Sequence, residues 1–212
     1  EVLFRGKLTT GTININAQNN EEGSASQSDG TRFTLLSNPY TTYVDASTFL
    51  STNSTSLHAS NGSIYVWNGS TMIAKSADSG YDIAPGEGFM IGTVGPDGTT
   101  KQIQFTTSMM SVDGGDNAIS GDIMDEDKAI LILQADQVDQ SSYTDMYFVE
   151  GRTNGFDFLY DAATFGLWGD KLIYSRLVED DQGVDLAIQS LPYSEMWDKV
   201  IPLGINALGG EE

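Results

Sequence analysis

An acidic stretch from residue 111 to residue 127, "SVDGGDNAISGDIMDED", carries the residue types best suited to binding a metal ion. Calcium takes about six to eight oxygen ligands and tolerates irregular loops, and glycines let backbone carbonyl groups approach the ion. The candidate ligands are Asp113, Asp116, Asn117, Asp122, Asp125 and Asp127. Their spacing does not match an EF-hand loop, so a solvated acidic loop and a Ca²⁺ site both stay open. With one histidine and no cysteine, a zinc site is implausible.

Nucleophilic catalysis by a Ser-His-Asp arrangement would need a histidine, and His58 is the only one. It lies in "STSLHASNGS", a polar run that is typical of a loop, and no Gly-x-Ser-x-Gly sequence occurs. We therefore expect His58 to be an exposed loop residue.

Paired carboxylates for glycoside hydrolysis are best represented by Asp157 and Asp161 in "NGFDFLYDA". Their spacing of four does not place both on one face of a strand, because the segment is expected to turn. Acceptance of backbone N–H groups in a tight loop, together with Thr153 and Asn154, fits this spacing better. The sequence assigns no catalytic residue and no enzyme activity, and calcium is the one cofactor it suggests.

Aromatic side chains offer a second binding chemistry, since sugar rings stack on exposed tryptophans. Trp67, Trp168 and Trp197 could form such a platform, although packing in the core or at a strand edge is the commoner role. Asn53, Asn61 and Asn68 each begin an Asn-x-Ser/Thr sequence, which indicates surface loops.

Composition limits the partners. Thirty acidic and ten basic residues give the 212-residue chain a net charge of −20, which repels nucleic acids and anionic lipid. Cations, basic protein surfaces and neutral glycans remain. No apolar run approaches the length that spans a membrane, so we expect no membrane insertion. The opening "EVLFRGKLTTG" has no signal-peptide pattern, which suggests a piece of a longer precursor whose export signal lies outside it.

Short β-branched and aromatic runs separated by Gly, Asn, Asp and Ser predict an all-β fold. We expect an antiparallel β-sandwich, either one large or two small packed sandwiches, with few helical turns. Asn68-Gly69 predicts a hairpin. The apolar run 129–133 is typical of a strand buried on both faces or central in a sandwich. Asp45 is expected to cap a helical turn over 46–50, and 193–197 to form another.

The acidic stretch is the one candidate domain boundary. It divides the chain into a first sandwich half, residues 1–110, an acidic loop, residues 111–127, and a second half, residues 128–212. The second half could lack the final strands of its sandwich. One continuous domain is the alternative.

Eight sequence segments, taken in their order along the chain, resemble motifs of a known protein family. They are "FRGKLTTGTINI", "TLLSNPYTTYVDASTFL", "IYVWNGS", "IAPGEGFMI", "FTTSM", "TNGFDFLYDA", "LAIQSLPY" and "VIPLGI". Together they resemble the conserved region near the C-termini of large surface and secreted proteins of Bacteroidota exported by type IX secretion. The resemblance covers residues 2 to 205 and implies a β-sandwich module, often adhesive. It also implies that Asn38-Pro39-Tyr40 is a structural corner.

These observations favour a non-enzymatic extracellular or outer-surface module that serves adhesion or extracellular assembly. The partners would be protein neighbours, including further copies joined by β-strand addition into a filament, or glycans. A carbohydrate-binding module attached to a secreted polysaccharide-degrading enzyme is the alternative, and a hydrolase comes third. Unpaired strand edges would favour assembly. Clustered exposed Trp and Tyr side chains would favour the carbohydrate-binding module, and a pocket with two facing carboxylates would favour the hydrolase.

Overall fold

The structure is a computed structural model that describes residues 10–19, 32–112, 128–137, 140–165 and 173–206. Within these ranges the fold is all-β, with one short α-helix. No helix in this part of the chain is long and apolar enough to cross a membrane.

The first half consists of three small sheets. Strands β1 and β8 pair with each other, four strands follow the order β2-β7-β4-β5, and three follow the order β6-β3-β9. The bounds are β1 (Ile13–Gln18), β2 (Phe33–Ser37), β3 (Tyr43–Asp45), β4 (Ile64–Trp67), β5 (Met72–Lys75), β6 (Asp82–Ile83), β7 (Gly88–Gly92), β8 (Thr100–Phe105) and β9 (Met110–Ser111). All pairings in this half are antiparallel.

Helix α1 (Ala46–Asn53) fills the centre of this half. Its start is fixed by Asp45, whose carboxylate accepts the Thr48 N–H at 2.6 Å, as the sequence predicts. The Phe49 ring lies 5.3 Å from the Phe89 ring of β7 and 5.0 Å from the Phe105 ring of β8. One helix thereby joins two sheets in one core.

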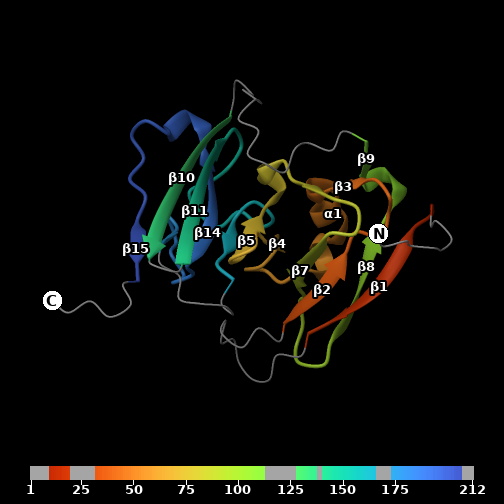
Figure 1. The fold of residues 1–212 in the computed structure, drawn as a ribbon. Helices are drawn as coiled ribbons and strands as arrows, with labels where there is room; N and C mark the ends of the chain where they lie inside the picture. The colour runs from red at the N-terminus through yellow and green to blue at the C-terminus, as the bar shows by residue number, and fades with distance from the viewer. Residues whose placement is uncertain (1–9, 20–31, 113–127, 138–139, 166–172, 207–212) are drawn as a thin grey trace.

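The second half is a sheet in the order β10-β11-β14-β13-β15, with β12 also paired to β14. The bounds are β10 (Lys128–Gln137), β11 (Gln140–Val149), β12 (Ala162–Ala163), β13 (Ile173–Ser175), β14 (Leu186–Pro192) and β15 (Leu203–Ile205). Strands β11 and β14 run parallel, whereas the other pairs are antiparallel. In Figure 1 β10, β11 and β14 lie at one side of the molecule, and β1 and β8 lie at the other.

A shared apolar cluster joins the halves. Tyr65 and Ala74, from β4 and β5, pack with Tyr147 of β11, Ala162 of β12 and Ile188 of β14. The opposite face of the β11–β14 pair has its own cluster, built on Met146, Phe148 and Leu191. The strand pair is therefore covered on both faces.

The hairpin predicted at Asn68-Gly69 is confirmed, since β4 and β5 pair across it and Gly69 has a φ of +100°. The prediction for residues 129–133 is wrong. These residues belong to β10, which pairs only with β11 among the described strands and lies at the end of the sheet. The domain boundary predicted at 111–127 lies almost entirely outside the described residues.

Candidate functional site

The predicted calcium ligands Asp113, Asp116, Asn117, Asp122, Asp125 and Asp127 all lie outside the described residues. In the part of the chain that is described, no group of three or more His, Asp or Glu side chains could hold a metal ion. The calcium site therefore stays a prediction.

The loop after β11 contains the two carboxylates considered for hydrolysis. Asp157 accepts hydrogen bonds from the Thr153 backbone N–H at 2.6 Å and from the Thr153 hydroxyl at 3.0 Å. The predicted loop role of Asp157 and Thr153 is thereby confirmed. Asn154 does something else: its side-chain oxygen accepts from the Lys199 ammonium at 2.8 Å.

Asp161 is fully buried and accepts two backbone hydrogen bonds. The Asp157 N–H donates to Oδ2 and the Ser190 N–H donates to Oδ1, both at 2.6 Å. Burial raises the pKa of Asp161 to about 7, and the two N–H groups act in the opposite direction. The side chain thus ties its own loop to the middle of β14.

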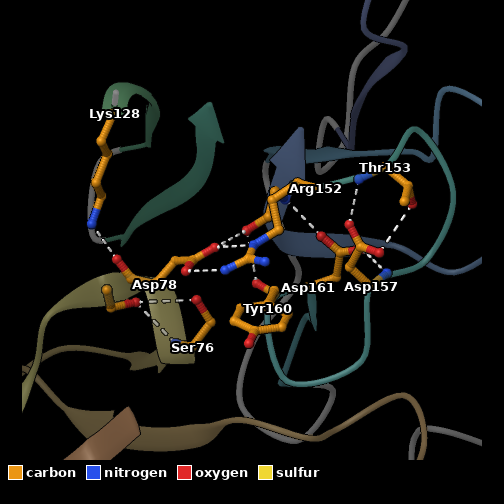
Figure 2. Close-up of polar contacts among 10 residues, drawn as sticks. Ser76, Asp78, Lys128, Arg152, Thr153, Asp157, Tyr160 and Asp161 are labelled. Carbon is orange, nitrogen blue, oxygen red and sulfur yellow. Dashed lines mark hydrogen bonds and ion pairs between the residues drawn. The ribbon is translucent and has the colours of Figure 1, made fainter. Parts of the chain in front are cut away.

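Arg152 and Asp78 join the two halves of the molecule, 74 residues apart in sequence. The Arg152 guanidinium donates two hydrogen bonds to the Asp78 carboxylate, Nε at 2.7 Å and Nη2 at 2.8 Å. It also lies over the Tyr160 ring, 3.4 Å from the ring centroid. Figure 2 shows Arg152 between Asp78 on one side and the Asp157–Asp161 loop on the other.

Two further groups complete this polar cluster. The Ser190 hydroxyl donates to the Asp78 carboxylate at 3.2 Å, and the Lys128 ammonium donates to the Asp78 backbone carbonyl. We name Asp78, Arg152, Asp157, Asp161 and Ser190 the junction cluster.

The junction cluster has a structural role in this arrangement. The Asp78, Asp157 and Asp161 carboxylates all accept hydrogen bonds from groups of the chain itself, mostly at close range. Asp157 and Asp161 are linked through the Asp157 N–H and do not face each other across a space for a sugar ring. Such a set orients backbone and joins elements, which is the chemistry that its geometry supports.

A second charged pair is half-buried and consists of Lys75 and Asp145. Burial lowers the pKa of Lys75 on β5, and burial raises the pKa of Asp145 on β11. The attraction between the two groups opposes both shifts. Like Arg152 and Asp78, this pair spans the two halves.

The Asn38-Pro39-Tyr40 segment is a structural corner. The Asn38 amide donates to the carbonyl groups of Thr42 and Ile83, each at 2.8 Å, and its oxygen accepts the Tyr40 N–H at 2.9 Å. The buried Tyr40 hydroxyl lies 2.9 Å from the Gly11 carbonyl oxygen and 2.8 Å from that of Phe105.

Two expectations about surface residues are wrong. His58 is half-buried, and its ring lies 3.3 Å from the Arg32 guanidinium. Asn53 and Asn61 are buried, whereas Asn68 lies exposed in the hairpin. The Asn53 amide bonds the carbonyl groups of Phe49 and Gln104, which explains its burial. A sequon pattern describes a modifying enzyme's recognition site and contains no information about packing.

The tryptophans are more exposed than expected. Trp67 at the end of β4 and Trp197 after β14 are both exposed, Trp197 by 86%. Trp168 lies outside the described residues.

The outer edge of β10 is a candidate binding feature that the sequence did not identify. Three consecutive residues there keep about half of their surface open: Ile130 51%, Leu131 46% and Ile132 48%. These three residues thus present apolar side chains on both faces of a ten-residue strand, beside an edge that no other described strand pairs. The sequence signal for this feature was the apolar run "AILIL", which is compatible with a strand at the edge of a sheet as well as with one at its centre.

Comparisons with protein-family models, with curated proteins and with solved structures gave no match.

Proposed function

We propose that the chain is a non-enzymatic extracellular module of a bacterial cell-surface or secreted protein, and that it serves adhesion or assembly through the edge of β10. The observation that carries this proposal is the exposed apolar edge strand. The motif resemblance to surface modules of Bacteroidota and the acidic composition support the extracellular setting.

Edge strands of this kind are normally avoided. An unpaired row of N–H and C=O groups is a template for another chain, and proteins usually protect it with lysine, proline, a bulge or a short strand. β10 has ten residues, no proline and a single lysine at its first position. Its pairing with β11 is regular from Lys128 to Gln137. A partner strand would find a long, regularly paired strand whose middle is apolar.

The interior supports a mechanical role for the scaffold. The junction cluster and the Lys75–Asp145 pair join the halves through charged groups, while the Tyr65–Ile188 cluster joins them through apolar contacts. A module that transmits force from a partner on β10 needs such links between its two halves.

Binding of a strand peptide tests the proposal. The probe is a fluorescein-labelled ten-residue peptide that alternates valine or isoleucine with threonine and lysine, and its control has two prolines in the same sequence. We expect saturable anisotropy changes with the wild type, none with the proline peptide, and loss of binding in Ile132→Lys. The introduced lysine would face Asp145, which lies directly across on β11, so the fold should tolerate it.

Val200→Lys is the matched control, because Val200 is exposed and lies outside the strands. Equal curves for the wild type and Ile132→Lys, or no binding by the wild type, would refute the role of β10.

Carbohydrate binding is the second candidate, and the exposure of Trp197 favours it. Polar residues lie near it in sequence: Glu195 and Lys199 flank it, and the Lys199 ammonium donates to Glu195 and to Asn154. Titration with soluble polysaccharides should then quench tryptophan fluorescence, and Trp197→Ala should abolish the binding while Trp67→Ala preserves it. Identical behaviour of all three proteins would remove this candidate.

A further inference from the structure

We infer that the occupant of the β10 edge is the β10 strand of a second copy of this chain, paired antiparallel about a two-fold axis at Ile132. The inference rests on the proposed function, since it names the partner of the same edge.

Length is the first argument for a second copy. Among the described strands, the sheet ends in β10 at one side, with ten residues, and in β15 at the other, with three. Pairing β15 of one copy on β10 of the next would leave most of β10 uncovered. Pairing β10 with β10 covers the whole strand, and a two-fold axis makes the interface self-complementary and closed.

The order of side chains along β10 is the second argument. In an antiparallel pair centred on Ile132, residue positions that sum to 264 lie opposite one another. Lys128 then lies opposite Asp136 of the second copy, twice, so this register brings no like charges together, while the Lys128 ammonium keeps its bond to the Asp78 carbonyl of its own chain. Ile130 lies opposite Gln134, and Ile132 lies opposite itself.

The residues on the other face of the strand are also compatible with this register. Leu131 lies opposite Leu133 of the second copy, again twice, and Ala129 lies opposite Ala135. No like charges meet along the strand on either face. Shifting the register by one residue would place Asp136 opposite Ala129 and would join unlike faces of the two sheets.

The exposures fit this arrangement. Ile130, Leu131 and Ile132, which have the largest exposed apolar surface in β10, lie at or beside the axis. They would form the centre of the interface, and the exposed Asp136 would lie at its rim. A strand edge is smaller than a standard interface, so we expect a dimer that dissociates on dilution.

The net charge of the chain predicts how the association depends on salt. Two chains of net charge −20 repel each other, and added salt screens this repulsion. Association through apolar β10 strands should therefore increase between about 50 mM and 500 mM sodium chloride, where the Debye length falls from above 10 Å toward 3 Å.

The experiment is sedimentation velocity of the full chain over a wide concentration range, with Ile132→Lys, Ile132→Glu and a mixture of the two. Each variant alone places like charges together at the axis, so each should stay monomeric where the wild type dimerises. The mixture places a lysine opposite a glutamate and should form the heterodimer. Ile205→Lys, on β15 at the other end of the sheet, should dimerise like the wild type. Circular dichroism melts establish that each variant is folded.

If Ile132→Glu unfolds because it faces Asp145, Asp136→Lys takes its place: it puts two lysines opposite each other at the rim and should weaken the dimer at least tenfold. A wild type that stays monomeric at every concentration overturns the inference. If that monomer still binds the strand peptide, the proposed edge survives and only the partner is wrong. Dimerisation of Ile132→Lys as strong as that of the wild type overturns β10 as the interface.

Discussion

Asp161 is the residue whose protonation links most directly to folding. Its pKa is raised from 3.8 in the unfolded chain to about 7 in the folded one, because it is buried. The folded state therefore binds the proton more strongly, and the stability that this proton contributes is complete below about pH 4. It is lost as the pH rises through about 7. Asp145, whose pKa is also raised by burial, acts in the same direction.

We predict that the free energy of unfolding falls between pH 4 and pH 7 by a few kcal/mol, since each pKa unit corresponds to about 1.4 kcal/mol. Urea unfolding at a series of pH values measures this. Asp161→Asn should flatten the dependence. It should also cost about 1–3 kcal/mol, because the asparagine NH₂ faces an N–H of Asp157 or Ser190. A variant with the pH slope of the wild type would contradict the assignment to Asp161.

Arg152 is the second residue with a defined energetic role. Arg152→Met leaves the Asp78 carboxylate nearly buried without its cation, and we expect a loss of about 3–5 kcal/mol. Adding Asp78→Asn should recover part of the loss, with a coupling energy of about 0.5–3 kcal/mol in a double-mutant cycle.

Arg176→Met is the matched control for this cycle. Arg176 pairs with Asp185 at 2.7 Å, but both side chains are more exposed than those of Arg152 and Asp78. Its loss should be smaller. Strict additivity of Asp78→Asn and Arg152→Met would show that the ion pair does not join the two halves.

At the scale of elements, the Asn-Pro-Tyr corner holds β2 against the β1–β8 pair. Tyr40→Phe removes the hydroxyl that reaches the Gly11 and Phe105 carbonyls and keeps the ring in the core. We expect a loss of about 1–3 kcal/mol, measured as a lower melting temperature in calorimetry. Tyr40→Ala should lose more, because it also leaves a cavity. A Tyr40→Phe melt equal to that of the wild type would mean that the hydroxyl bonds contribute nothing net.

Local signals predicted the elements well. Asn68-Gly69 requires a turn with positive φ, and the Asp45 side chain can cap only a helix that starts at the next residue. The tight loop at Asp157 also followed from short-range hydrogen bonding. Each of these outcomes depends on residues within about four positions of one another.

Long-range pairings could not be predicted in the same way. The apolar run in β10 shows that its side chains avoid water, but it does not show which strand lies beside it. The parallel pairing of β11 with β14 and the contact of Asp78 with Arg152 join segments far apart in sequence. These contacts follow from the packing of the whole chain, so the sequence indicated Asp157 and Asp161 but not their link to Asp78, Arg152 and Ser190.

For the whole molecule, the acidic stretch from Asp113 to Asp127 makes a separate prediction. If it binds calcium, millimolar Ca²⁺ should raise the melting temperature and EDTA should lower it. At one hundred times the dissociation constant the gain is about 2.7 kcal/mol. The combined change Asp122→Asn and Asp125→Asn should abolish the response, and Asp97→Asn in the loop before β8 should not. An unchanged melting temperature in calcium would remove the site.

The net charge of −20 and the apolar edge of β10 have opposite effects on association. On the proposed account, the charge keeps copies apart in general, and the apolar middle of β10 offers an edge at which contact is favourable. Specific pairing without bulk aggregation is the behaviour that this combination predicts.

Hydrogen exchange of residues 128–137 tests the central claim most directly. In the separate chain we expect protection only of the N–H groups of β10 that point to β11, and fast exchange of those on the outer edge. At high protein concentration, or with saturating strand peptide, we predict that the outer N–H groups of β10 become protected while β15 stays unchanged. Exchange in residues 128–137 that is identical under all three conditions would contradict the claim that β10 accepts another strand.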